Sequence, residues 1–209
     1  MGHVHSTGFL RDIPEGRAPW SSHGFRAWLV ALAVAWALVA VPCLRAQSLK
    51  HTDYDVKAAY LYNFGHFVEW PVNVAAAKND SFTVCVLGQD PFGAVLDTTL
   101  AGETIAGKRV AAKRISTLQE SGNCQILFLS SAEEAQLKTI LKALNKQAVL
   151  TVSDMPEFSQ HGGMIQFVLE GKRVRFEVNL AAVQHAGLTL SSELLKVATT
   201  VRRNSSSGD

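Results

Sequence analysis

Residues 154–161 contain the only mixed group of acidic and basic side chains in the sequence that could move protons. Asp154 and Glu157 lie on either side of Met155-Pro156, and His161 follows in the same segment. A carboxylate beside an imidazole can act as general base and general acid. A polar loop also produces such a group by chance, and no Gly-x-Ser-x-Gly nucleophile motif accompanies it. We therefore predict that the protein is not an enzyme, and we keep a hydrolase built on these three residues as an alternative.

Phosphate and metal chemistry have weaker signals in the sequence. The segment Gly88-Gln-Asp-Pro-Phe-Gly93 has the outer glycines of a phosphate-binding loop, but it lacks the Lys and the Ser or Thr that would hold a phosphate and magnesium. It therefore predicts a turn from a strand into a helix. No histidine after residue 46 has a His or Cys partner at metal-ligand spacing. The sequence thus predicts neither a metal site nor a bound cofactor.

Cys85 and Cys124 each lie in a short apolar run that has the pattern of a strand. If the two strands are neighbours, the sulfur atoms can form a disulfide, which would stabilise the fold by about 4 kcal/mol on the chain-entropy model. An even number of cysteines favours pairing in an exported protein. The alternative is two separate buried thiols that act as small apolar residues.

Two groups of side chains could form a surface for a partner protein. Alternation along one strand places Arg173, Arg175 and Glu177 on a common face. That face is either a solvated outer surface or the polar rim of a binding surface. Aromatic residues of an earlier helix also allow two interpretations: they are part of the core, or they form an exposed patch that a partner binds. The candidate interaction residues are Tyr60, Phe64, Trp70, Arg173, Arg175 and Glu177.

The elements that must position these residues begin with an aromatic-rich helix. Its apolar positions recur every three or four residues, which is helical spacing, and Trp70-Pro71 ends it because the residue before proline avoids the helical region. The side expected to be buried contains Val56, Ala59, Tyr60, Asn63, Phe64, Phe67 and Val68.

Strands and helices then alternate. Apolar or alternating runs at residues 81–87, 108–115, 124–129 and 148–152 predict strands, and Ser131 and Glu134 form a capping box for a helix to residue 146. Residues 164–169 and 174–179 predict a hairpin, followed by helical segments at 180–186 and 193–201. The order predicts an α/β fold in which a mainly parallel sheet is flanked by helices, with a C-terminal antiparallel hairpin at its edge.

The N-terminal region predicts export. Residues 27–41 are uncharged and apolar after Arg26, which is typical of a signal peptide with an unusually long polar region before it. An uncleaved anchor is the alternative. We expect a leader at 1–46, one domain at 47–203 and a disordered tail at 204–209. Four of the 20 Lys and Arg residues and two of the 18 Asp and Glu residues precede residue 47, so the mature chain has no net charge and does not suit nucleic acid.

Six blocks of residues, in register along nearly the whole predicted mature chain, carry a family resemblance. The blocks are Lys57-Ala-Ala-Tyr-Leu-Tyr-Asn-Phe with Glu69-Trp-Pro71, Cys85-Val-Leu-Gly with Pro91-Phe-Gly93, Cys124-Gln-Ile-Leu-Phe-Leu-Ser130, Leu150-Thr-Val-Ser-Asp154 with Phe158, Gly162-Gly-Met-Ile165, and Val174-Arg-Phe-Glu-Val-Asn179 with Leu188-Thr-Leu-Ser191. In this order the blocks resemble the YfiR family of bacterial periplasmic proteins, although no single block is diagnostic.

The resemblance implies a small α/β protein that forms a homodimer in the periplasm. It also implies binding to the periplasmic sensor domain of an inner-membrane diguanylate cyclase, which is held inactive, so that cyclic di-GMP and biofilm formation fall. Membrane contact would occur only through this partner or an uncleaved leader. The resemblance supports a Cys85–Cys124 bridge. The best-known member has a second cysteine pair later in its chain, whereas this sequence has no cysteine after Cys124.

A second hypothesis is a periplasmic module that binds a small ligand. Parallel α/β sheets bind ligands beyond the carboxyl ends of their strands, which here would be near Gly88, Ser130 and Ser153.

Overall fold

The computed structural model describes residues 53–71 and 81–203. The predicted leader at 1–46 and tail at 204–209 lie outside these ranges, so the predicted division into segments stays a prediction. Within the described ranges, no helix combines the length and the apolar character that a membrane crossing needs.

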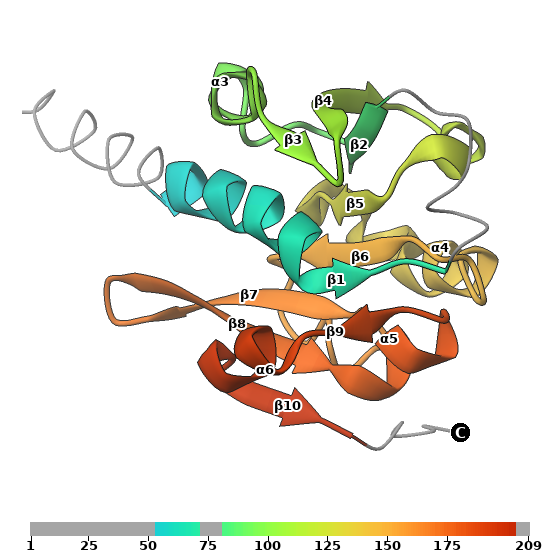
Figure 1. Cartoon of the computed structure of the whole chain (residues 1–209). Coiled ribbons are helices and arrows are strands. Elements are labelled where there is room, and N and C mark those ends of the chain that lie inside the picture. Colours follow the sequence, from blue (N-terminus) through green and yellow to red (C-terminus); the bar gives the residue numbers. More distant parts are fainter. Residues whose placement is uncertain (1–52, 72–80, 204–209) are drawn as a thin grey trace, which may run out of the picture. The chain divides into compact units, whose positions relative to one another are not determined.

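One sheet forms the centre of the described fold (Figure 1). Strands β4, β2, β5, β6 and β7 run parallel, β8 is antiparallel to β7, and β3 is antiparallel to β4. In spatial order the strands are β10 (Thr200–Arg202), β8 (Arg173–Asn179), β7 (Ile165–Glu170), β6 (Leu150–Ser153), β5 (Ile126–Leu129), β2 (Ser81–Leu87), β4 (Lys108–Ile115) and β3 (Thr104–Ile105).

The predicted α/β class, the mainly parallel sheet and the hairpin are therefore confirmed. The hairpin lies one strand in from the edge, because β10 pairs with the outer side of β8. This pairing reaches only Glu177–Asn179 of β8. Within the described ranges, no strand pairs with the outer side of β8 at residues 173–175, and that stretch remains an open sheet edge.

A two-stranded sheet stands apart from the large one. Strand β1 (Val68–Glu69) directly follows the helix at residues 53–67, called helix 53–67 below, and pairs antiparallel with β9 (Thr189–Leu190). The helix therefore ends at residue 67, before the predicted stop at Trp70-Pro71.

Helices cover both faces of the large sheet (Figure 1). One face carries helix 53–67 together with α3 (Ala94–Leu100), α5 (Leu180–His185) and α6 (Ser192–Val197). The opposite face carries α4 (Leu137–Ala143) and the 3-10 helix η1 (Leu118–Asn123), and the 3-10 helix η2 (Ser131–Gln136) leads into α4. Because neighbouring residues of a strand point to opposite faces, Val84 and Val86 enter the first core and Cys85 and Leu87 the second.

Aromatic rings dominate the core beneath helix 53–67. Phe64 contacts Phe167 and Phe176, with ring centroids 5.9 and 5.2 Å apart. The Tyr60 ring stacks on the Phe64 ring, with their centroids 5.9 Å apart. Such contacts add stability beyond the burial of apolar area.

The buried side of helix 53–67 is rotated from the predicted one. Its buried residues include Lys57, Ala58 and Leu61, whereas Val56 and Phe67 are exposed. Phe64 belongs to both sets. The local pattern misplaces the buried side of the helix because Lys57 is a residue expected in solvent. Its pairing with Asp154, which lies far along the chain, buries it instead.

Two other helices also depart from the prediction. The helix expected from Ser131 to residue 146 divides into η2 and α4, and its cap is Ser130, whose Oγ accepts a hydrogen bond from the Ala132 N–H at 3.4 Å. The last helix was expected to reach residue 201. It ends at Val197, and residues 200–202 instead form β10 on the exposed edge of β8.

Candidate functional site

Cys85 and Cys124 form a disulfide, with their Cα atoms 5.8 Å apart. Cys85 lies on β2, and Cys124 directly follows η1 in the segment that leads into β5, the neighbouring strand. Both side chains are buried in the second core beside Leu127 and Phe158. The bridge therefore holds two adjacent parallel strands together beneath α4, and the alternative of two free thiols does not apply.

Two of the three predicted acid–base residues contact each other, and the third is bound by a helix from elsewhere in the chain. The Asp154 carboxylate is held by helix 53–67: Lys57 Nζ lies 2.7 Å from its Oδ2, and the Tyr54 hydroxyl donates to the same atom at 2.9 Å. Burial and the Asp154 carboxylate raise the pKa of Tyr54. Glu157 and His161 form a separate, exposed pair with a 3.9 Å contact. Asp154 thus joins helix 53–67 to the carboxyl end of β6.

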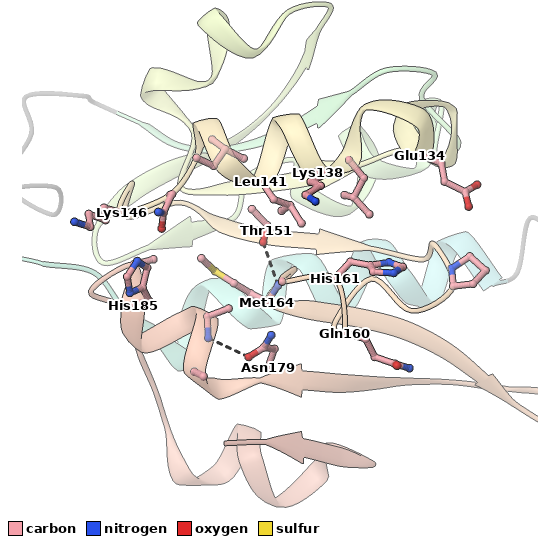
Figure 2. A pocket seen from close by; sticks show the side chains of 18 of the residues that line it. Glu134, Lys138, Leu141, Lys146, Thr151, Gln160, His161, Met164, Asn179 and His185 are labelled. Carbon is pink, nitrogen blue, oxygen red and sulfur yellow. Dashed lines mark hydrogen bonds between the residues drawn. The ribbon is translucent and has the colours of Figure 1, made fainter. Parts of the chain in front are cut away.

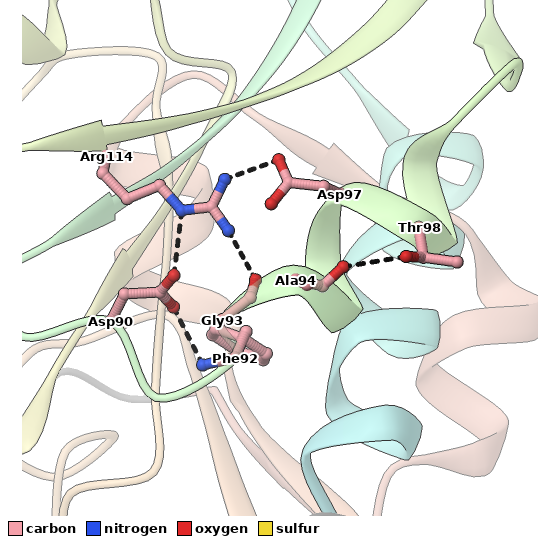
Figure 3. A network of polar contacts seen from close by, with 7 residues as sticks. All are labelled: Asp90, Phe92, Gly93, Ala94, Asp97, Thr98 and Arg114. Atoms are coloured by element: carbon pink, nitrogen blue, oxygen red, sulfur yellow. Dashed lines mark hydrogen bonds and ion pairs between the residues drawn. The ribbon is translucent and has the colours of Figure 1, made fainter.

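The loop between β2 and α3 is held by one arginine (Figure 3). Arg114, on β4, donates to Asp90 at 2.9 Å, to Asp97 at 2.6 Å and to the Gly93 carbonyl at 2.7 Å. The hydrogen bond from Arg114 lowers the pKa of Asp97. The Asp90 carboxylate also accepts from the Phe92 N–H at 2.8 Å. These contacts within the chain stabilise the loop as the predicted strand-to-helix turn.

The carboxyl-end residues proposed for a small ligand are also used within the chain. A Cβ atom at Gly88, where φ is 85°, would lie 2.6 Å from Oε1 of Glu133, so the Glu133 side chain rests directly on the loop. The Ser153 hydroxyl donates to the Leu129 carbonyl at 2.7 Å and accepts from the Met155 N–H at 3.1 Å. Ser130 caps η2. The three residues named by the second hypothesis thus have partners within the chain, and ligand binding beside them stays a prediction.

The aromatic candidates for a partner surface lie mainly in the core. Phe64 is fully buried, so it supports the fold rather than an exposed patch. Tyr60 is half-buried between Phe64 and Phe176. Trp70 is half-buried and packs edge-to-face on Phe82 at 5.2 Å.

The charged candidates on β8 lie on its outward face, as alternation predicts. Arg173 is exposed and Arg175 half-buried; together with Val56 they line a shallow hollow of about 310 Å³. Glu177 has partners within the chain: it accepts from the Ser159 hydroxyl at 3.1 Å and lies 3.6 Å from Nη2 of Arg202. The six candidates therefore do not form one continuous surface, and their role in binding stays a prediction.

Sequence reasoning missed a larger feature, a groove of about 1010 Å³ between α4 and α5 (Figure 2). Leu141 and Leu144 border it on one side, Ala182 on the other, and Met164 forms part of its floor. Four basic residues lie along its length: Lys138, Lys146, His161 and His185. Lys138 and Leu141 are three residues apart on one helix, so the sequence alone could have placed them on the same side of that helix. The approach of α5 to α4 was not visible in the pattern.

Polar groups at the floor of this groove are bonded within the chain. Thr151 Oγ1 accepts from the Met164 N–H at 3.1 Å. The Asn179 amide donates to the Ser159 carbonyl at 2.9 Å and accepts from the Ala182 N–H at 3.0 Å. Within residues 53–71 and 81–203, no cluster of His, Cys, Asp and Glu has an arrangement suited to a metal ion.

Comparisons with known proteins gave a similar solved structure and a family match. A crystal structure of the ABC domain in complex with L-Trp from Streptococcus pneumonia is similar at 12% sequence identity and a TM-score of 0.42. The similarity covers 62% of this chain and 58% of that chain, so the present chain spans less than two thirds of that protein. A family model described as YfiR/HmsC-like matches residues 54–199, from the first turn of helix 53–67 to the residue before β10. The chain belongs to the YfiR/HmsC-like family.

Proposed function

We propose that this protein is a periplasmic regulator that binds the periplasmic sensor domain of an inner-membrane diguanylate cyclase and holds that enzyme inactive. Cyclic di-GMP and biofilm formation would fall as a result. The observation that supports the proposal is the family match over residues 54–199, which includes nearly every described element. The Cys85–Cys124 disulfide is consistent with it, because such bonds persist in oxidising compartments.

The proposed mechanism is differential binding rather than catalysis. A regulator that binds the inactive state of the sensor domain more tightly than the active state shifts the cyclase toward inactivity by that difference in affinity. The separation of Asp154 from the Glu157–His161 pair favours this mechanism over hydrolysis. We propose further that the protein acts as a homodimer, and that it contacts the membrane only through its partner or an uncleaved leader.

Deletion of the gene tests the proposal. Cyclic di-GMP measured by mass spectrometry and biofilm mass should both rise severalfold, and both should return to normal when the full chain is expressed in trans. A strain that also lacks the cyclase recovered with the protein from membranes serves as the control. Deletion should have no effect in that strain. Unchanged cyclic di-GMP after deletion, with every diguanylate cyclase gene intact, would contradict the proposed function.

A further inference from the structure

Basic side chains lie on both lips of the groove between α4 and α5, with both lysines on the α4 side. Lys138 lies on α4, Lys146 lies just beyond its end, and His185 lies in the last turn of α5. All three are exposed. Figure 2 shows Lys138 on the α4 side of the groove, while Glu134, the acidic residue of the lining, lies at one end. The lips therefore favour a negatively charged occupant.

Apolar side chains form much of the surface between these lips. Leu141 and Ala182 are half-buried from the two sides, and Leu144, Met164 and Ala186 are buried below them. An occupant with an apolar stripe would cover Leu141 and Ala182, which are still partly in contact with solvent. This combination of an apolar floor and charged lips is what an amphipathic helix requires of its receptor.

The distribution of polar groups argues against a small molecule. Small-ligand sites usually have a few polar groups that converge on one point. Here Thr151 Oγ1 already accepts the Met164 N–H, and the Asn179 amide is bonded on both sides. The remaining charges are spread along the lips. They suit an elongated occupant with several negative charges.

A second copy of this chain is also a poor occupant. Two such grooves packed face to face would bring Lys138 and Lys146 of one copy against the same cationic lips of the other. Like charges across an interface are unfavourable. A different, acidic protein is therefore a better candidate to bind in the groove.

We propose that the groove between α4 and α5 receives an acidic, amphipathic helical segment of the partner protein. The inference deepens the proposed function and rests on it for the identity of the partner. Apolar side chains of the segment cover Leu141 and Ala182, and its carboxylates face Lys138 and Lys146. The surface is distinct from the Arg173–Arg175 edge of β8.

A synthetic peptide tests the chemistry of the groove without knowledge of the partner. The probe is a fluorescein-labelled peptide of about 15 residues, with Leu spaced for one helical face and Glu and Ala elsewhere; the matched peptide has Lys in place of Glu. Fluorescence anisotropy should show binding of the acidic peptide alone. The double variant K138E/K146E should bind it about tenfold more weakly at low salt, and this difference should shrink at high salt.

Two further variants locate the binding. Ala181→Trp, at a half-exposed position of the lining, should block the groove without a change in charge. K113E/K196E makes the same charge change at exposed lysines of β4 and α6 and should bind as the wild type does. Thermal unfolding confirms that each variant folds. Equal binding of both peptides, or wild-type affinity in both groove variants, overturns the inference.

A cellular arm separates this inference from the proposed function. If deletion raises cyclic di-GMP, K138E/K146E should fail to restore the normal level and K113E/K196E should restore it. Full restoration by K138E/K146E overturns the groove as the docking surface and leaves the function intact. Peptide binding at the groove together with unchanged cyclic di-GMP after deletion has the opposite meaning: the groove stands and the proposed function fails.

Discussion

Lys57 is a buried cation whose main partner is a single carboxylate. Its side chain is 8% exposed, and its ammonium lies 2.7 Å from Asp154 and 4.2 Å from the centre of the Tyr54 ring. Removal of one member of a buried ion pair leaves the other charge without compensation. We expect Lys57→Met to lower the free energy of unfolding by about 3 kcal/mol, measured by urea denaturation.

A surface lysine provides the control for this prediction. Lys138→Met, at an exposed position, should change the free energy of unfolding by less than about 0.5 kcal/mol. The double variant K57M/D154N should recover part of the loss, because the stranded carboxylate is then replaced by a neutral amide. A loss in Lys57→Met no larger than in Lys138→Met would show that the pair does not anchor helix 53–67.

Arg114 gives a prediction with a defined pH dependence. Its hydrogen bond lowers the pKa of Asp97 below the ordinary value of 3.8. A carboxylate with a lowered folded pKa contributes stability that is present above its ordinary pKa and is lost as pH falls through the folded value. Arg114→Ala should therefore destabilise the protein more at neutral pH than at about pH 2. The difference should stay below about 1 kcal/mol, because Asp97 is largely exposed.

Urea titrations of the wild type and Arg114→Ala across this pH range measure the difference. Arg109→Ala, an exposed arginine on the same strand, is the matched control and should show no such trend. The same destabilisation by Arg114→Ala at both ends of the range would mean that the Asp97 contact contributes nothing to stability.

At the scale of elements, the disulfide fixes the relation between β2 and β5. It joins residues 39 apart in sequence, and closure of a loop of that length stabilises a fold by about 4 kcal/mol on the chain-entropy model. The variant C85A/C124A should lose about this free energy of unfolding, and a reductant should lower the stability of the wild type toward the same value. The reductant should leave the variant unchanged. A stable, unaltered reduced wild type would contradict the prediction.

The six strands from β4 to β8 across the large sheet were predictable because their patterns are local, whereas the edge strands β3 and β10 were missed. The run that contains β5 is apolar on both faces, as a central parallel strand requires, and the hairpin of β7 and β8 alternates around a short polar turn. Helix α6 was extended too far because Val201 fits a helical pattern as well as a strand. The open edge of β8, supplied by a distant segment, decides between the two.

The candidate site was less predictable because its contacts also depend on segments that are distant along the chain. The Cys85–Cys124 pair could be proposed from two apolar runs and a family resemblance, but the burial of Lys57 depends on Asp154, which lies 97 residues along the chain. The groove exists only where α4 and α5 meet across the ends of β6 and β7. No local periodicity specifies that meeting.

At the scale of the whole molecule, the state of the cysteines tests export. Both cysteines of the predicted mature chain are bridged, whereas Cys43 lies in the predicted leader. Protein taken from the host envelope, denatured without reductant and treated with a thiol reagent should therefore take up no label if the leader has been removed. Mass spectrometry after reduction provides the control and should reveal two thiols. One labelled cysteine before reduction would show that the leader is retained.

The open side of β8 also affects how separate molecules meet. At residues 173–175 the outer side of this strand offers backbone groups that no described strand uses, and such a row can recruit strands from other copies into growing aggregates. Lys172 and Arg173, both exposed at the tip of the hairpin, place positive charge where a second hairpin would have to align. Mutual repulsion at these tips would oppose that alignment, so a change of both residues to leucine should favour fibrous self-association at high concentration while leaving the core untouched.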